Sequence, residues 1–396
     1  MPDGAPDADV LVLGGGAAGL MCAATAGYRG RRVTVLEGSN RCGKKILMSG
    51  GGRCNFTNTG SSPANFLSRN PHFCKSALAR YRPADFIELV ERHGVAYHEK
   101  ELGQLFCDES SKQIVKLLLD ECEWAGVRIE TGITIESVSH DGECFAVDTA
   151  CGSFRAPKLV VATGGLSIPS LGASGIGYAI ARQFGHAIVE TRAGLVPFTL
   201  SGKPLEQYAE LAGVALPVAV RAGGSEFRNA LLFTHRGLSG PAILQISSYW
   251  QLGQAVEIDL LPGRDAGAEL IALQQQGHKA ELKTVLSEWL PKRLAQLLCS
   301  AFFVNKPVNQ YKHAELKDIG FALRHWRITP SGTEGYRTAE VTLGGVDTDG
   351  VSSASFESKH QAGLYFIGEV LDVTGWLGGY NFQWAWASGH ACGSAV

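Results

Sequence analysis

Apolar runs alternate with small-residue turns through the first 40 residues. Residues 10–13 form a continuous apolar run, which is typical of a buried parallel strand. Residues 20–26 are small and apolar, which predicts a helix lying on a sheet, and a second apolar run at 33–36 ends on Glu37. Strand, glycine turn, helix, strand and acid follow one another in the order of a βαβ unit.

Similar patterns extend this unit along the chain. Proline at 83 and His93-Gly94 bound a predicted helix over 83–92, and Ser110-Ser111 precede a second helix that runs to Gly126. Residues 127–129 continue the parallel sheet, 133–138 begin an antiparallel stretch, and 159–162 form another buried strand. Residues 38–60 are glycine-rich and are expected to be a loop.

The pattern changes character near Pro197. Residues 214–220, 231–234 and 256–260 are β-like without crossover helices between them, and about 266–325 is helical and charged. The pattern of the first part of the chain then recurs, with a buried strand at 363–369 and a small-residue helix from 380. We therefore expect an α/β nucleotide-binding domain in two parts, 1–195 and 346–396. The insert between them, 196–345, has β-barrel-like parts at 196–263 and 326–345 and a helical part at 264–325.

Composition narrows the class of protein. The 396 residues carry 36 Lys and Arg against 38 Asp and Glu, a net charge of −2, which gives no footprint for a polyanion. The chain has no apolar run of eighteen residues, and residues 1–7 contain acids rather than a signal sequence. We expect a cytoplasmic protein with a small-molecule substrate, no nucleic-acid partner and no membrane association. A local basic patch stays open as an alternative.

The ten cysteines do not form a metal or redox motif. None of them is part of a CxxC pair, so the sequence predicts no metal site and scattered reduced thiols. Cys42 and Cys54 flank a loop expected near a cofactor, but a redox role for them is the less favoured interpretation.

The glycines of the βαβ unit indicate nucleotide binding. Gly14 permits the tight turn, Gly16 lets the backbone approach a pyrophosphate, and Gly19 lets the helix lie close to the strand. Glu37 is placed to accept hydrogen bonds from a ribose. NAD and FAD both use this unit, so it does not distinguish between them.

Three later segments favour a flavin. Three successive glycines, 50–52, beside Lys44, Lys45 and Arg53 suit a loop that passes close to a planar ring or phosphate. The buried strand at 159–162 closes on Thr163-Gly164, a turn of the kind that returns to the cofactor. In 368–383 a strand ends on Glu369, which could bind ribityl hydroxyls, and the N–H groups around 379–381 could face the flavin edge that gains negative charge on reduction.

The insert carries two further polar motifs. Residues 233–241 contain His235 and Arg236, and 332–337 contain Tyr336, which could donate a proton. The alternative is that each motif is a turn, because Ser239-Gly240-Pro241 is a good helix start. A second complete dinucleotide-binding unit is missing, so a separate NAD(P) domain is not expected.

Residues 43–58, 231–237, 332–337 and 368–383 together resemble the bacterial YhiN/BaiN-type flavoproteins over essentially the full chain. The resemblance implies a glutathione-reductase-like FAD-binding Rossmann domain interrupted by a β-barrel-like and small helical insert. It implies FAD contacts at Gly14, Gly16, Ala17, Ala18, Gly19, Glu37, Lys45, Gly51, Gly52, Arg53, Val138, Gly368, Glu369, Gly379 and Asn381.

The predicted activity is an FAD-dependent oxidoreductase that takes hydride from NADH or NADPH and reduces an unsaturated or carbonyl-conjugated small molecule. Arg53, His235, Tyr336 and Asn381 are the candidate catalytic residues. Three alternatives stay open: an amine oxidase using oxygen, a flavoprotein with a structural FAD that acts as a binding or RNA-modification protein, and a plain NAD dehydrogenase. The sequence does not give the oligomeric state.

Overall fold

The computed structural model describes residues 6–396, and these form two compact units. Residues up to Arg192 and from Val341 onward make unit 1, and Ala193–Glu340 make unit 2. The prediction about residues 1–7 therefore falls mostly outside the described residues.

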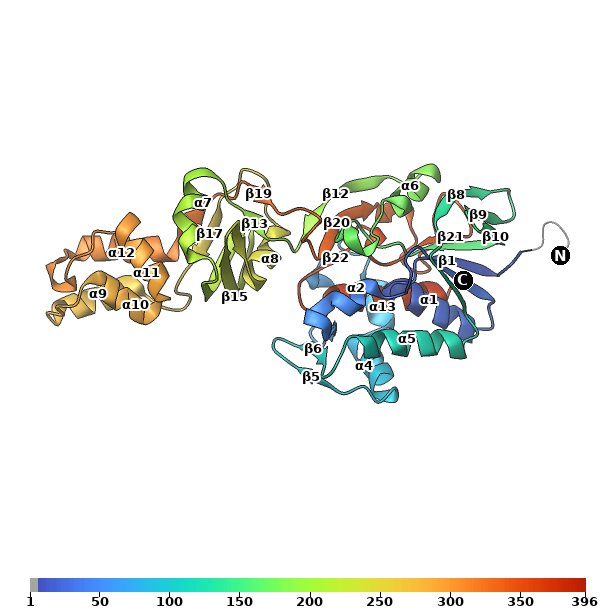
Figure 1. Cartoon of the computed structure of the whole chain (residues 1–396), viewed down its shortest axis with the longest axis horizontal. Helices are drawn as coiled ribbons and strands as arrows, with labels where there is room; N and C mark the ends of the chain where they lie inside the picture. Colours follow the sequence, from blue (N-terminus) through green and yellow to red (C-terminus); the bar gives the residue numbers. More distant parts are fainter. Residues whose placement is uncertain (1–5) are drawn as a thin grey trace. The chain divides into compact units, whose positions relative to one another are not determined.

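A parallel sheet forms the centre of unit 1, with the strand order β21-β11-β1-β2-β7 (Figure 1). The strands are β1 (Val10–Leu13), β2 (Val33–Glu37), β7 (Arg128–Thr131), β11 (Lys158–Val161) and β21 (Leu364–Phe366). All four residues of β1 are fully buried, as expected of a strand covered on both faces. Because β21 comes from the C-terminal part of the chain, the two predicted parts complete one sheet.

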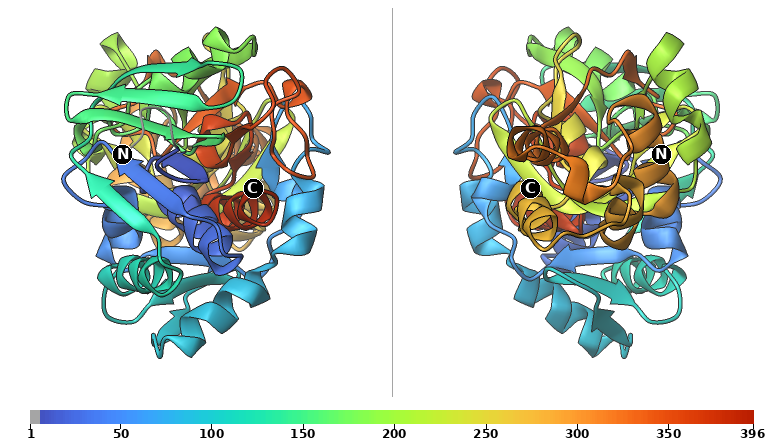
Figure 2. Two further views of the ribbon diagram at one scale, coloured as in Figure 1. Left: turned by 90° about the vertical axis from the view of Figure 1, so that its right-hand side faces the viewer. Right: turned by 90° about the vertical axis from the view of Figure 1, so that its left-hand side faces the viewer.

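Helix α1 (Ala17–Tyr28) lies beside the C-terminal helix α13 (Tyr380–Gly393) (Figure 2). Small residues permit this close approach: a Cβ atom at Gly389 would lie 2.5 Å from the carbonyl oxygen of Ala18. Helix α5 (Lys112–Trp124) packs against α1 as well. The N-terminal and C-terminal parts of the chain are thus joined through a helix pair as well as through the sheet.

Smaller elements surround this core. The helices are α2 (Lys44–Met48), α3 (Lys75–Arg80), α4 (Pro83–Arg92) and α6 (Ile176–Gln183). The strands are β3 (Asn55–Asn58), β4 (Phe66–Leu67), β5 (Tyr97–Glu99), β6 (Gln104–Cys107), β8 (Ile135–His140), β9 (Phe145–Thr149), β10 (Gly152–Ala156), β12 (Ile188–Gly194), β20 (Val341–Val346) and β22 (Thr374–Gly375).

The expectation of an unbroken loop over 38–60 is wrong, because the segment contains α2 and β3. Strand β3 pairs with β6, and Phe56 is fully buried. Its ring packs on those of Phe86 and Tyr97, and its carbonyl oxygen accepts a 2.8 Å hydrogen bond from the indole N–H of Trp386. These partners lie 30 to 330 positions away, so the local glycine content could not reveal the strand.

Unit 2 combines an antiparallel sheet with a helical part. The sheet has seven strands in the order β18-β17-β14-β15-β16-β13-β19, and the described pairing ends at β18 and β19 instead of closing into a barrel. The strands are β13 (Phe198–Thr199), β14 (Ala215–Ala222), β15 (Ser225–Thr234), β16 (Gly237–Ser239), β17 (Val256–Asp259), β18 (Trp326–Ile328) and β19 (Gly332–Thr333). Helices α7 (Gly202–Tyr208) and α8 (Pro241–Ser247) accompany the sheet. The helical part comprises α9 (Ala266–Gln275), α10 (Leu282–Trp289), α11 (Lys292–Ala301) and α12 (His313–Arg324).

The insert ends earlier than the predicted 345. Strand β20 pairs with β12, and the two final glycines of its sequence lie against unit 1 backbone. A Cβ atom at Gly344 would lie 2.2 Å from the Glu190 carbonyl oxygen, and one at Gly345 would lie 2.6 Å from that of Val370. Residues 341–345 are therefore part of the nucleotide-binding unit and not of the insert's sheet.

Candidate functional site

The turn between β1 and α1 has the close packing that a dinucleotide cradle requires. Gly14 has a φ of 109°, and a Cβ atom there would lie 2.5 Å from the carbonyl oxygen of Ala162 on the neighbouring strand's end. A Cβ atom at Gly19 would lie 1.9 Å from the Gly14 carbonyl oxygen. Gly16 differs, because no atom lies within 4 Å of its added Cβ. Gly14 and Gly19 thus serve the packing, and Gly16 faces open space at the start of α1, beside Ala17 and Ala18.

Glu37 lies next to this turn and holds it. Its Oε2 accepts a 2.7 Å hydrogen bond from the Gly15 N–H, and its Oε1 accepts one of the same length from the Ser39 N–H. A carboxylate has about four acceptor sites in total, so both oxygens retain a site for a ribose hydroxyl. The acid at the end of β2 therefore stands where a nucleotide sugar is expected.

Lys45 and Glu369 meet although 324 positions separate them. The ammonium of Lys45 donates 2.7 Å hydrogen bonds to Glu369 Oε2 and to Ser167 Oγ. The other carboxylate oxygen, Oε1, accepts a 2.9 Å bond from the Thr342 N–H. Both Lys45 and Glu369 are predicted cofactor residues, and the fold brings them into one polar cluster.

Ser167 and Thr342 complete this cluster and were not predicted from the sequence. Thr342 Oγ1 also accepts a 2.7 Å hydrogen bond from the Leu166 N–H, so it ties the segment after β11 to β20. Ser167 could have been found from the sequence, because it lies four residues after Thr163, a predicted cofactor residue. The sequence pattern places 341–345 in the insert, so it does not indicate that Thr342 lies near the cofactor.

The triple-glycine loop is open on the side that two of its glycines face. Gly50, Gly51 and Gly52 all have left-handed φ values, between 57° and 86°, that favour glycine. An added Cβ atom meets nothing within 4 Å at Gly51 or Gly52, whereas at Gly50 it would lie 2.9 Å from the Asn55 nitrogen. The adjacent Arg53 is exposed, and no side-chain hydrogen bond or ion pair holds it in the part of the chain described. The loop can therefore accept a flat or anionic ligand.

Thr163 and Gly164 follow strand β11 directly opposite the Gly14 turn. The Thr163 hydroxyl is buried and has no hydrogen-bond partner among residues 6–396. An orphaned buried hydroxyl is uncommon and points to a missing partner. Together with the open cradle at Gly16 and the open loop at Gly51 and Gly52, it fits a bound FAD.

The C-terminal turn contains Asn381, a candidate catalytic residue whose side chain bonds to the main chain. Gly368 and Gly379 adopt positive φ values of 73° and 94°, and Gly379 caps α13. The Asn381 amide accepts a 2.8 Å hydrogen bond from the Gly375 N–H and donates to the carbonyl oxygens of Gly375 and Trp376 at 2.9 and 3.1 Å. Its side chain thus holds the turn ahead of α13.

Val138 lies on β8 in a separate three-stranded sheet of unit 1. Its side chain is buried, and its carbonyl oxygen accepts a 2.6 Å hydrogen bond from the Gln183 amide. The adenine contact expected through its backbone stays a prediction.

The two cysteines near the cradle are poor nucleophiles. Burial raises the pKa of the Cys42 thiol to about 11, and the neighbouring Glu37 carboxylate adds to the shift. Burial also raises the pKa of Cys54 far above its ordinary value. Only the thiolate is reactive, so neither thiol is suited to redox chemistry. The described residues contain no cluster of three or more His, Cys, Asp or Glu that could hold a metal ion.

In unit 2 the two polar motifs are brought together by one short strand. Strand β13 pairs with β16 on one side and with β19 on the other, which places the 235–236 turn beside residues 334–336. Arg236 Nη1 lies 3.9 Å from Glu334 Oε2, and His235 is exposed. The Tyr336 hydroxyl is buried and has no hydrogen-bond partner in the described chain. The pairing of His235 with Tyr336 in one region was not predictable from their 101-residue separation.

No helix among the described residues has the length and apolar character needed to cross a membrane.

Comparison with known proteins places the whole chain in one family. Residues 8–395 match the family described as HI0933-like protein Rossmann domain. The chain is 53% identical over 393 residues to an Escherichia coli protein named ribosomal RNA dihydrouridine synthase, covering 97% of this chain and 96% of that protein. It is 30% identical over 404 residues to a Clostridium scindens protein named 3-dehydro-bile acid delta(4,6)-reductase, covering 97% and 98%.

A solved structure shares the fold across the full length. A 3-ketosteroid-delta4-(5alpha)-dehydrogenase from Rhodococcus jostii RHA1 aligns with a TM-score of 0.50 and 15% identity, covering 99% of this chain and 98% of that chain. The family match, the FAD-type Rossmann sheet and the cradle geometry lead to one conclusion. The chain belongs to the HI0933-like Rossmann family, the YhiN/BaiN-like flavoproteins, and is an FAD-dependent oxidoreductase of that family.

Proposed function

We propose that the protein reduces a uridine of ribosomal RNA to dihydrouridine, with NADH or NADPH as the hydride source. The observation that carries this proposal is the 53% identity, across nearly the full length of both chains, to a protein named ribosomal RNA dihydrouridine synthase. A second relative with that name, from Haemophilus influenzae, is 50% identical over 98% of both chains.

The reaction belongs to the class expected from the sequence. The C5=C6 bond of uracil is conjugated to the C4 carbonyl group, so hydride adds at C6 and a proton adds at C5. The name of the Clostridium scindens relative likewise describes double bonds at positions 4 and 6 beside a 3-oxo group. Both substrates are carbonyl-conjugated alkenes, and they differ in size and charge.

The substrate class departs from the expectation of a small molecule and no nucleic-acid partner. That expectation rested on the net charge of −2, which averages over the whole chain. A protein binds a polyanion through a local surface, so the average does not decide the matter.

Different residues of unit 1 would contact different parts of the cofactor. Gly16 and the N-terminal N–H groups of α1 would face the pyrophosphate, and Glu37 the adenosine ribose. The Lys45–Glu369 pair would contact the ribityl chain. Bound FAD supplies hydride transfer between the nicotinamide and the uracil ring.

The chain's own contribution to chemistry is positioning and charge stabilisation. The N-terminus of α13 at Gly379 carries partial positive charge, which stabilises negative charge on the flavin edge. Tyr336 is the candidate proton donor for C5, because its buried hydroxyl lacks a partner. Arg53 and His235 remain candidates for orienting the substrate.

Anaerobic half-reactions test this proposal. The holoenzyme is bleached with NADPH or NADH and then mixed with deproteinised ribosomal RNA from a strain that lacks the modification. We expect the oxidised flavin absorbance to return with RNA and not with buffer. Bleaching by an amine but by neither nicotinamide would make the protein an amine oxidase. Reoxidation by a conjugated steroid ketone but not by RNA would assign the small-molecule reaction instead.

A further inference from the structure

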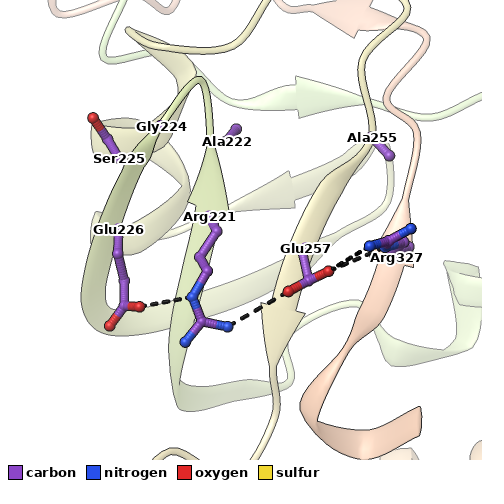
Figure 3. Close-up of a pocket in the computed structure, with 8 residues that line it drawn as sticks. All are labelled: Arg221, Ala222, Gly224, Ser225, Glu226, Ala255, Glu257 and Arg327. Carbon is purple, nitrogen blue, oxygen red and sulfur yellow. Dashed lines mark hydrogen bonds and ion pairs between the residues drawn. The ribbon is translucent and has the colours of Figure 1, made fainter. Parts of the chain in front are cut away.

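Unit 2 carries a row of charged side chains across four neighbouring strands (Figure 3). The strand register places Arg221 opposite both Glu226 and Glu257, and places Glu257 opposite Arg327. Arg221 Nε lies 2.7 Å from Glu226 Oε2, and Arg327 Nη2 lies 2.9 Å from Glu257 Oε2. Arg228 extends the row, with its Nε 2.8 Å from Glu226 Oε1. Four members of the row line a hollow of about 540 Å³: Arg221, Glu226, Glu257 and Arg327.

The carboxylates in this row hold the guanidinium groups without covering them. The side chains of Arg228 and Arg327 are 68% and 71% exposed, whereas those of Glu226 and Glu257 are 34% and 20% exposed. Three arginines share two carboxylates in these ion pairs, and the guanidinium groups of Arg228 and Arg327 stay largely exposed. Their outer N–H groups can therefore meet phosphate oxygens.

A second hollow has a volume of about 310 Å³, and one ion pair connects a residue of its lining to a residue that lines the first. His325 lines the second hollow, and its Nδ1 lies 2.9 Å from Glu257 Oε1, which lines the first. The second hollow also contains Arg264, Lys317 and Arg324 against a single lining acid, Asp265. Arg264 is paired with Glu269 outside the hollow, and Lys317 and Arg324 form no ion pair within residues 6–396.

One exposed aromatic ring lies among these cations. Lys317, Phe321 and Arg324 stand at positions i, i+4 and i+7 of α12 and so share one helix face. Phe321 is 67% exposed, and its ring centroid lies 4.4 Å from that of His325. A cationic groove with an exposed aromatic ring is the arrangement that binds single-stranded nucleic acid, through phosphate contacts and base stacking.

We propose that these two hollows together form a docking surface for a single-stranded segment of ribosomal RNA. Arg228, Arg327, Lys317 and Arg324 contact backbone phosphates, and a base stacks on Phe321. This surface rests on the proposed function for the identity of its RNA. It deepens that function by assigning substrate recognition to the insert.

The test measures RNA binding directly, apart from catalysis. A fluorescein-labelled oligouridylate is titrated with full-length holoenzyme at several salt concentrations. Phe321→Ala is expected to weaken binding by about tenfold, the usual range for loss of one stacked base. The pair Lys317→Gln and Arg324→Gln is expected to weaken binding and to reduce the salt slope by about 2, one for each phosphate contact.

Matched controls come from the same unit. Phe302→Ala removes another exposed ring, 47% accessible, and Lys203→Gln with Lys283→Gln removes two exposed lysines outside both hollows. These controls should bind the oligonucleotide as the unaltered protein does. Arg228→Gln with Arg327→Gln tests the first hollow, and thermal unfolding identifies any variant that has lost its fold.

The outcomes separate this surface from the proposed function. If the holoenzyme forms dihydrouridine and the α12 variants show an unchanged KM for ribosomal RNA, the surface is wrong and the function survives. If no dihydrouridine forms but the α12 variants weaken RNA binding and the controls do not, the surface is supported and the function fails. Equal weakening in the controls and in the α12 variants would also overturn the surface.

Discussion

The two units use their polar residues in opposite ways. In unit 1, Glu37, Glu369 and Asn381 are committed to main-chain N–H groups and hold turns around an open cradle. In unit 2, Arg228, Arg327 and Phe321 are largely exposed. A bound cofactor requires a preorganised site, whereas exposed side chains can adapt to a large ligand. The comparison predicts that substitutions in unit 1 act on FAD and those in unit 2 act on the substrate.

Gly16→Ala should give the largest effect. The added methyl group meets no protein atom, so the fold should persist, but it occupies the space where the pyrophosphate is expected. FAD affinity should fall by about a hundredfold or more, about 3 kcal/mol. Titration of the apoprotein with FAD measures this, and thermal unfolding checks the fold.

The matched control for this change is Gly175→Ala. Gly175 is also a helix N-cap with a negative φ, −82°, and the nearest atom to its added Cβ is 4.0 Å away. It should bind FAD normally. Equal losses of FAD in both variants would mean that neither effect reports on the cradle.

Tyr336→Phe should separate substrate chemistry from cofactor binding. The hydroxyl has no partner in the described chain, so its removal should not lower the free energy of unfolding. Reoxidation of the reduced holoenzyme by RNA should slow by about a hundredfold, the lower end of the range for loss of a proton donor. FAD affinity and bleaching by the nicotinamide should not change. A variant that unfolds more easily but reacts at the normal rate would show that the tyrosine is structural.

Glu369→Gln should weaken FAD binding by about tenfold, about 1.4 kcal/mol. The change removes the charge that pairs with Lys45 and weakens the acceptor expected at the ribityl chain, while the amide oxygen can still accept the Thr342 N–H. The apoprotein is first loaded with a fluorescent flavin analogue. The FAD concentration that displaces the analogue then measures the loss of FAD affinity. A change in RNA affinity with normal FAD affinity would contradict the assignment of this cluster to the cofactor.

The smallest effect concerns the acid stability of unit 1. Burial, with His360 nearby, lowers the pKa of His186 to about 4, and its Nε2 lies 2.7 Å from Ser358 Oγ. The unfolded state, with an ordinary pKa of about 6.5, binds the proton first, so stability falls as pH drops from about 6.5 toward 4. Between pH 7.5 and pH 6 the loss from this group should be about 1 kcal/mol.

Denaturant unfolding of the protein and of His186→Gln at both pH values checks this expectation. The variant should be less stable at pH 7.5, because it loses buried packing, but it should show a smaller loss between the two pH values. An identical pH dependence in both proteins would assign the acid sensitivity to other groups.

The sequence predicted the cofactor unit well because its signals are local. Glycines at 14, 16 and 19 with an acid at 37 lie within one βαβ unit, and the returning strand at 364–366 is a distinct apolar run. The roles of Asn381 and Thr342 were not predictable in the same way. Their partners are set by β20 and by the turn ahead of α13, which depend on contacts between segments far apart in the chain.

The surface of unit 2 could not be predicted for a related reason. Arg221, Glu257 and Arg327 become one row only through the register of three strands, and the helices between 266 and 324 separate the last of these strands from the other two. The net charge of the chain conceals this row, because acids elsewhere balance it. The sequence-based expectation of no nucleic-acid partner rested on the net charge of the whole chain, which does not show where charges gather.

Analysis of the nucleosides in treated RNA tests the central claim most directly. Deproteinised ribosomal RNA from a strain without the modification is incubated anaerobically with the holoenzyme and NADPH or NADH, digested, and examined by mass spectrometry. The account predicts a uridine heavier by two hydrogen atoms at a defined site, formed only when holoenzyme and a nicotinamide are both present. Ribosomal RNA that stays unmodified, while the same holoenzyme reduces a small conjugated ketone, would contradict it.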